Sequence, residues 1–226
     1  MAEVKNKPEA SVEEALSQSE AFIIKNKKTI LGAVIAIVVI IAGFMSYKNF
    51  IAEPREQKAA AALFKGEQYF GNDQFELALN GDSLGYIGFI KVADEFGGTA
   101  SGKLAKAYAG LSYAQLGQWE QAIKYLEKFD GDDQMVAPAV QGALGDCYAN
   151  LDNLDKAASA FMKAAQKADN NTLSPLFLKK AAEVYEKQGK YNDAVKAYTQ
   201  IKEKYFNSYQ AMDVDKYIER ANALKK

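Results

Sequence analysis

The sequence predicts an all-α protein in which a single transmembrane helix precedes an α-solenoid of about four helix-turn-helix repeats and a capping helix. One observation is an uncharged apolar run near the N-terminus, and another is a pattern of small, aromatic and turn-forming residues that recurs three times. The third is composition. The 226 residues include no histidine and one cysteine, which argues against catalytic triads, most zinc sites and an internal disulfide.

The apolar run at residues 29–47 predicts an uncleaved transmembrane signal-anchor. No charged residue occurs between Ile30 and Met45, and the uncharged stretch of 19 residues makes a helix of about 28 Å, close to the thickness of the hydrocarbon core. A cleaved signal peptide is the alternative, but its apolar core has about 7–15 residues and ends at small side chains. Here the run begins after residue 28 and ends with Phe44 and Met45, so the anchor is favoured.

The charges that flank this run predict its orientation. Three lysines lie within residues 25–28, whereas the other edge has Lys48 and then Arg55 and Lys58 further along the chain. Because positively charged flanks stay in the cytoplasm, we expect residues 1–28 to form a cytosolic tail and the larger C-terminal part to lie outside. An apolar stripe in the tail fits either a surface that contacts the membrane or a partner, or simply the start of the anchor helix.

Three stretches of the remaining chain share one pattern with spacings of about 35 and 37 residues. A small residue is followed by a tyrosine, a turn residue, an aromatic or leucine, an alanine and a large apolar residue. The matching positions are Gly110, Tyr113, Gly117, Trp119, Ala122 and Leu126; Gly145, Tyr148, Asp152, Leu154, Ala157 and Phe161; and Ala182, Tyr185, Gly189, Tyr191, Ala194 and Tyr198.

Each position of the pattern has a mechanical explanation. The small residue lets the two helices of one repeat approach closely, and the turn residue tolerates a left-handed backbone between them. The large apolar residue packs toward the next repeat, while Pro138 and Pro175 fall where helices begin. The whole solenoid is expected to span residues 53–226, after the polar junction at 53–55. Its predicted parts are an irregular first repeat at 56–99 with an insertion near 80–85, regular repeats at 103–136, 138–171 and 175–206, and a capping helix at 207–226.

These residues resemble the tetratricopeptide repeat (TPR), position by position. The resemblance implies a curved inner face, built by the first helix of each repeat, that binds peptides or helices of partner proteins. Ordinary solvated positions are the alternative. The candidate face comprises Leu104, Ala107, Tyr108, Leu111, Gln115, Asp146, Asn150, Lys179, Lys180, Glu183 and Lys187.

Chaperone-binding TPR domains grip a terminal carboxylate with several basic residues and asparagines on this face. The matching positions here are Ala107, Leu111, Ala143, Leu176 and Lys180. Only one of them is basic, so this carboxylate-binding activity is not expected.

Other constellations predict no chemistry, and we expect no catalytic residue, cofactor or metal. The acidic residues 130–133 lack the continuation of a calcium-binding loop and fit a helix-capping turn instead. Cys147 lies between residues of the repeat pattern and is expected to pack in the core. The net charge of −1 argues against a nucleic-acid partner. An enzyme that uses lysine and carboxylate pairs is the remaining alternative, without support from the spacing.

The layout of a short charged tail, one span and repeats with an irregular first unit resembles the YfgM-like family of membrane-anchored periplasmic TPR proteins. That resemblance implies a single-pass protein of the bacterial inner membrane with its C-terminal domain in the periplasm. It also implies an accessory role in protein export at the SecYEG translocon, linking emerging polypeptides to periplasmic chaperones. A scaffold for cell-wall or outer-membrane assembly complexes is the alternative.

Overall fold

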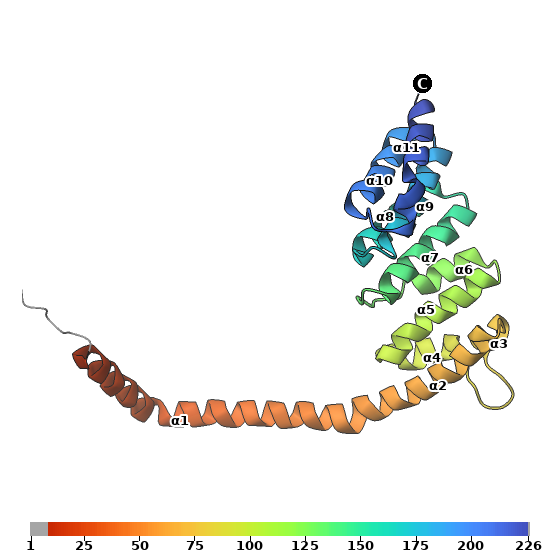
Figure 1. Cartoon of the computed structure of the whole chain (residues 1–226). Coiled ribbons are helices and arrows are strands. Elements are labelled where there is room, and N and C mark those ends of the chain that lie inside the picture. Colours follow the sequence, from red (N-terminus) through yellow and green to blue (C-terminus); the bar gives the residue numbers. More distant parts are fainter. Residues whose placement is uncertain (1–8, 226) are drawn as a thin grey trace, which may run out of the picture. The chain divides into compact units, whose positions relative to one another are not determined.

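The computed structural model describes residues 9–225, and these residues form helices and turns with no strand among them. The chain divides into two compact units, Met1–Pro54 and Arg55–Lys226. The elements in chain order, labelled in Figure 1, are α1 (Glu9–Tyr47), the π-helix η1 (Lys48–Ala52), α2 (Glu53–Gly71), α3 (Phe75–Asn80), α4 (Phe89–Phe96), α5 (Ala100–Gln115), α6 (Trp119–Leu126), α7 (Val136–Asn150), α8 (Leu154–Ala168), α9 (Ser174–Lys187), α10 (Tyr191–Lys204), the 3-10 helix η2 (Tyr209–Asp213) and α11 (Val214–Ala223).

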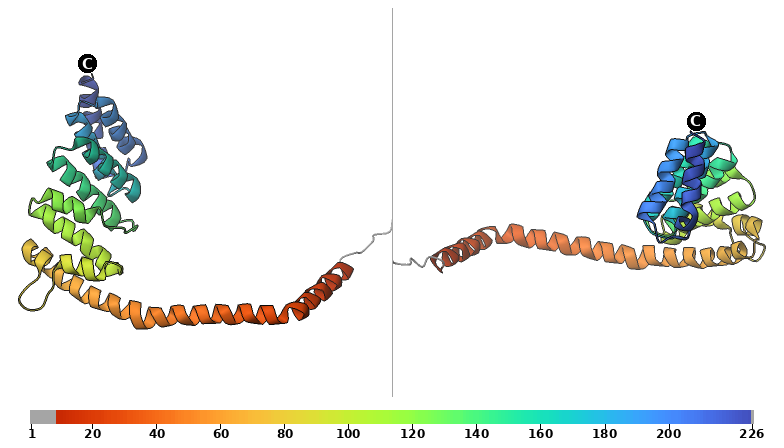
Figure 2. Two further views of the ribbon diagram at one scale, coloured as in Figure 1. Left: turned by 180° about the vertical axis from the view of Figure 1, so that it is seen from behind. Right: turned by 45° about the horizontal axis from the view of Figure 1, so that its top comes forward.

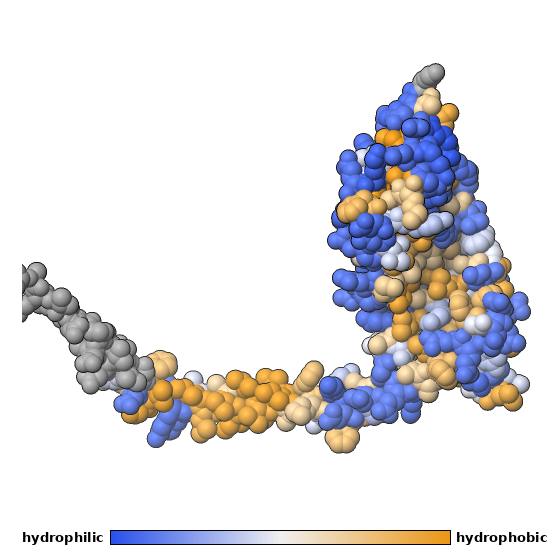
Figure 3. All heavy atoms as spheres, in the orientation of Figure 1, coloured by the Kyte–Doolittle hydropathy of each residue, from blue (hydrophilic) through white to orange (hydrophobic). Residues whose placement is uncertain are grey.

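The N-terminal unit contains a helix that is long and apolar enough to cross a membrane. Its apolar side chains pack against nothing, and Ile40, for example, is 70% exposed. Figure 3 shows these residues as a continuous hydrophobic stretch of the helix. Of the predicted tail, residues 1–8 lie outside the described residues, and residues 9–28 belong to the same helix as the apolar run.

The predicted polar junction at residues 53–55 does not interrupt the helical backbone. The chain is helical from Glu20 through Gly71, and only the π-helical turn η1 departs from α geometry in this stretch. Pro54 lies two residues after the end of this turn, and a proline ring clashes with the carbonyl four residues earlier in a regular α-helix. We attribute the π turn to this proline, because wider turns and kinks in long helices arise at such positions.

The C-terminal unit is a solenoid of helix pairs that stack in sequence order. Helix α5 packs on α6, α7 on α8 and α9 on α10, and each pair packs on the next, as Figure 1 and the views in Figure 2 show. Helix α11 packs on α10 and closes the array. This arrangement is the all-helical TPR-like solenoid that the sequence predicts.

The first pair is irregular because its second helix is interrupted. Helices α2 and α3 are joined by a tight turn, a loop at residues 81–88 follows, and α4 then packs on α5. Glu56 of α2 accepts hydrogen bonds from the backbone N–H groups of Ala100 (2.8 Å) and Ser101 (3.1 Å) at the start of α5. Burial alone would raise the pKa of Glu56, but a hydrogen bond from the Ser101 hydroxyl (2.6 Å), together with these backbone bonds, outweighs it and lowers that pKa. Glu56 of α2 thereby satisfies backbone N–H groups at the start of α5.

Asp82 holds the loop at residues 81–88 in place. Its carboxylate accepts a hydrogen bond from the Tyr69 hydroxyl at 2.5 Å and lies 3.0 Å from Lys65 Nζ. It also accepts the backbone N–H groups of Leu84 and Tyr86, both at 2.8 Å. The hydrogen bond from Tyr69, helped by the others, holds the pKa of this carboxyl well below its usual range. The inserted loop is therefore braced on α2, although Leu84 at its tip is 83% exposed.

The small residues of the repeat pattern lie where the two helices of a repeat touch. A Cβ atom placed on Gly110 would lie 2.5 Å from Leu126 Cγ, and one on Gly145 would lie 2.6 Å from Phe161 Cδ1. Real Cβ atoms do not approach other heavy atoms this closely. The prediction that these positions allow close helix contact is confirmed. A second aromatic ring packs against α7, because the Phe177 side chain of α9 occupies the space next to Gly142.

The turn residues of the pattern adopt the left-handed backbone that the sequence predicts. The φ angle is +72° at Gly117 and Gly189 and +56° at Asp152. The same angle of +56° at Asp73 marks the equivalent turn between α2 and α3. Since side chains with a Cβ atom rarely adopt this region, the turn positions accept few residue types.

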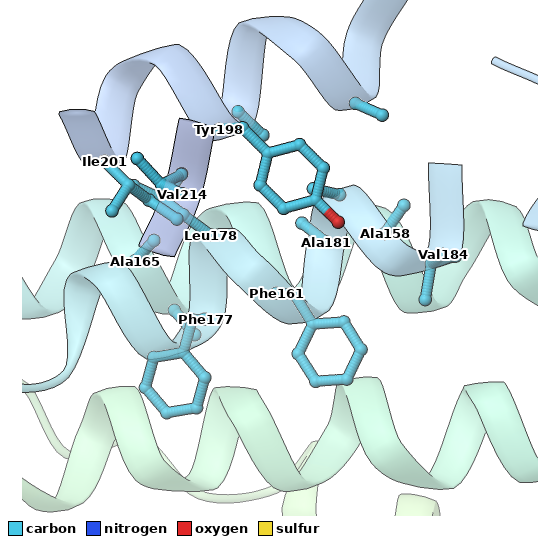
Figure 4. Close-up of a cluster of buried hydrophobic side chains, with 14 of the residues drawn as sticks. Ala158, Phe161, Ala165, Phe177, Leu178, Ala181, Val184, Tyr198, Ile201 and Val214 are labelled. Atoms are coloured by element: carbon cyan, nitrogen blue, oxygen red, sulfur yellow. The ribbon is translucent and has the colours of Figure 1, made fainter. Parts of the chain in front are cut away.

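Within residues 9–225, buried apolar side chains form three clusters along the solenoid. The C-terminal cluster combines residues of α8 to α11, and Figure 4 shows Phe161 and Phe177 side by side over α7, with Tyr198 above them. Cys147 lies in the middle cluster and is fully buried, which confirms its predicted place in the core. Burial raises the pKa of its thiol to about 11. The core is thus shared between neighbouring repeats.

Substituting leucine for Gly145 is expected to lower the free energy of unfolding by about 1–3 kcal/mol, because the new side chain overlaps the buried Phe161 ring. Urea unfolding of the full chain in a neutral detergent measures this change. Gly71→Leu is the matched control, since Gly71 is also helical and has open space around it. The control variant should stay within about 1 kcal/mol of the parent. Equal losses at both positions would contradict the close contact.

The Cys147 thiol is expected to react with a disulfide reagent such as DTNB at least about 100-fold more slowly in the native protein than in urea, because burial blocks access and a pKa of about 11 depletes the thiolate. Absorbance of the released thiol measures both rates. Rapid labelling in native buffer would show that α7 opens around this residue.

Candidate partner-binding surfaces

The α5 part of the predicted partner-binding face is mostly covered. Ala107 is only 2% exposed and belongs to the core, so its place on an accessible face was predicted wrongly. Tyr108 is half-buried, because its ring stacks on Phe89 of α4 at 5.1 Å. Leu104 packs against the N-terminal core cluster, which contains Phe89. The irregular first repeat thus covers the side of α5 that the prediction assigned to a partner.

Further along α5, two predicted residues remain at the surface. Leu111 is half-buried against the middle core cluster, and Gln115 is exposed at the end of the helix. These residues adjoin the next first helix, α7, which packs against α5. This part of the predicted face therefore consists of one apolar and one uncharged polar side chain.

The structure brings together the predicted residues of α7 and α9. Both carboxylate oxygens of Asp146 accept hydrogen bonds from Lys180 Nζ at 2.8 Å. Asn150 is exposed, and its amide donates to the Asp146 backbone carbonyl at 2.9 Å. Lys187 pairs with Asp152 at 2.7 Å. The charged groups of this part therefore neutralise one another across the repeat boundary.

The last part of the face contacts the capping helix, which the sequence analysis did not include in the site. Lys179 Nζ lies 3.1 Å from the Tyr217 hydroxyl and 4.6 Å from the centre of its ring. The hydrogen bond to Tyr217 raises the pKa of Lys179, so its charge persists at neutral pH. Glu183 remains exposed on the same helix. Its carboxylate and the Lys179–Tyr217 pair are the polar features of this end.

Ion pairs between consecutive repeats follow the repeat length. Separations of 34 or 35 residues join Asp152 to Lys187, Asp155 to Lys190, Asp169 to Lys204 and Glu186 to Arg220. This regular offset between acidic and basic residues is visible in the sequence and is the signal from which the ion pairs could have been predicted. Because most of these pairs are exposed, each contributes little to stability on its own.

Two grooves open between consecutive second helices, away from the predicted face. The first, here called the Tyr148 groove, has a volume of about 420 Å³ and lies between the end of α6, α7 and α8. The second, the Tyr185 groove, has a volume of about 1030 Å³ and lies over α9 between α8 and α10. Neither groove was predicted from the sequence, because both arise only from the tertiary packing of the helices.

Among residues 9–225 no group of three or more aspartate, glutamate or cysteine side chains is placed to hold a metal ion. The acidic turn at 130–133 serves structural contacts. Asp130 pairs with Lys103 at 3.0 Å, and Asp133 accepts the backbone N–H groups of Met135 (2.9 Å) and Val136 (2.5 Å) where α7 begins.

Comparison with known proteins identifies the repeats. One family model described as tetratricopeptide repeat matches residues 105–130 and 180–208, and a second model of that description matches residues 139–168. No curated protein matches the chain.

Two solved structures share the fold. They are crystal structures of TPR-like repeats from a putative kinesin light chain of Podosopora anserina, one of them of a variant with a single substitution. Each has 14% sequence identity, covers 75% of this chain and 87% of its own, and superposes with a TM-score of 0.55. Repeats of this kind are typically non-enzymatic scaffolds, and they imply protein partners. The C-terminal unit of this chain is thus a TPR-like solenoid that contains tetratricopeptide repeats.

Proposed function

We propose that this protein is a membrane-anchored scaffold whose TPR solenoid binds other proteins beside the membrane. The observation that carries the proposal is a fully exposed apolar helix that continues directly into the first helix of the solenoid. An exposed apolar surface of this size is unfavourable in water but stable in lipid. The domain boundaries are those of the sequence analysis: a tail at 1–28, an anchor at 29–47 and a solenoid at 53–226.

The proposed orientation places the N-terminus in the cytoplasm and the solenoid in the periplasm of a bacterial inner membrane. The lysines at residues 25–28 support it through the positive-inside rule. The proposed role is accessory to protein export or envelope quality control, with the SecYEG translocon and periplasmic chaperones as partners. This role rests on the resemblance to the YfgM-like family.

The proposed partner surface is the accessible part of the first-helix face. It combines the uncharged side chains of Leu111 and Gln115 with the polar groups around Lys180 and Glu183. Anchoring raises the effective concentration of the solenoid for partners at the membrane, so that contacts of modest affinity suffice.

The membrane proposal predicts that the full-length protein stays in the pellet after alkaline carbonate extraction of bacterial membranes, since an apolar span is not released by high pH. A periplasm-dependent alkaline phosphatase fused after residue 226 should be active, and a fluorescent protein that matures only in the cytoplasm should be dark there. Release by carbonate would refute the anchor. The reverse reporter pattern would refute only the orientation.

The partner surface predicts site-specific crosslinking. A photo-crosslinking amino acid at Glu183, on the first-helix face, should capture translocon subunits or periplasmic chaperones in cells. The same amino acid at the exposed Gln121 of α6 is the control and should not. Mass spectrometry identifies the captured proteins. Recovery of cell-wall synthases or outer-membrane assembly proteins instead would replace the export role by the assembly role.

A further inference from the structure

The Tyr148 groove and the Tyr185 groove have equivalent positions in consecutive repeats but differ in charge balance. Three aspartates and three lysines line the Tyr185 groove. Two of these lysines are already neutralised, Lys190 by Asp155 at 2.7 Å and Lys204 by Asp169 at 2.6 Å. This groove therefore presents nearly balanced charge to a ligand.

Three lysines and a single carboxylate line the Tyr148 groove. In the part of the chain that the structure describes, Lys156, Lys163 and Lys167 have no carboxylate within 4 Å. Lys156 lies over the Tyr148 ring at 5.2 Å, and Lys167 donates to the Gly131 backbone carbonyl at 3.0 Å. Since neither contact removes positive charge, the groove carries uncompensated ammonium groups.

The one carboxylate of the Tyr148 groove is already engaged, and the floor is apolar. Glu127 accepts a hydrogen bond from the Tyr148 hydroxyl at 2.6 Å. The floor consists of the buried side chains Leu126, Val140 and Leu144. A groove of about 420 Å³ falls within the range of ligand-binding clefts, about 300–1,000 Å³. Because these floor side chains are almost fully buried, the accessible lining is mainly polar and cationic, and it favours a ligand rich in carboxylates.

We propose that the Tyr148 groove binds an acidic peptide segment of a partner protein, with carboxylates at Lys156, Lys163 and Lys167 and only minor apolar contacts to the floor. Charge complementarity selects this occupant, because within the described residues these three lysines have no carboxylate partner of their own. A planar lipid surface fits less well, because lipid headgroups do not reach an apolar floor recessed between helices. The groove is separate from the first-helix face, and the proposal requires neither that face nor the anchor.

The test measures binding of a fluorescein-labelled ten-residue peptide of alternating glutamate and leucine to the full chain in an uncharged detergent, by fluorescence anisotropy. Reversing two charges with Lys156→Glu and Lys167→Glu, which line only this groove, should weaken binding at least about tenfold. The double variant Lys91→Glu, Lys124→Glu is the control. It changes the net charge equally at two exposed lysines outside the groove and should change the affinity less than about twofold.

Two further measurements distinguish binding in this groove from nonspecific electrostatic attraction. Gln141→Trp, which places a ring over the floor, should weaken binding without changing the charge. Replacing glutamate by serine in the peptide should abolish binding. Circular dichroism melts confirm that each variant is folded.

Equal losses in both double variants, or equal binding of the serine peptide, would overturn the proposal. Displacement of the peptide by micelles doped with phosphatidylglycerol, at a concentration that leaves the serine peptide unaffected, would reassign the groove to lipid headgroups. If crosslinking at Glu183 fails while the peptide still binds, the proposal for the first-helix face is refuted and the proposal for the Tyr148 groove is supported.

Discussion

The solenoid depends on one contact, the seating of a large apolar side chain from the second helix of a repeat on a small residue of the first helix. At Gly145 this contact leaves no room for a Cβ atom, because the Phe161 ring occupies that space. Phe177 of the following repeat occupies the corresponding space at Gly142, so one helix receives a ring from its own repeat and a ring from the next. Close packing of this kind makes the core continuous, and each repeat is stable mainly through its neighbours.

The repeat architecture was predictable from sequence because its constraints are local. A left-handed turn restricts Asp152 and Gly189, and a tight helix contact restricts Gly110, so the same residue types recur at fixed spacing. The partner-binding face was less predictable. The register of α5 did not show that α4 would cover Tyr108 or that Ala107 would face the core, since both follow from the neighbouring helices. The helical course of the polar junction at residues 53–55 was not predictable either, because it depends on the π turn η1, which accommodates Pro54 without ending the helix.

Electrostatics distinguishes the surfaces that the backbone repeats. The regular pairing of acids with bases one repeat later neutralises the Tyr185 groove and much of the first-helix face. The Tyr148 groove lacks those acids, although its helices have the same arrangement. A repeated fold therefore carries different binding properties in consecutive units, and a few side chains decide which unit attracts a ligand.

The sealed position of Cys147 makes this chain convenient for spectroscopy. It is the single cysteine of the sequence and lies wholly inside the middle cluster. A second cysteine engineered on the surface, for instance on α6 or α10, therefore becomes the one accessible attachment point for a nitroxide or a fluorophore. Distances between the solenoid and a lipid bilayer can be measured in this way with the native core left unaltered.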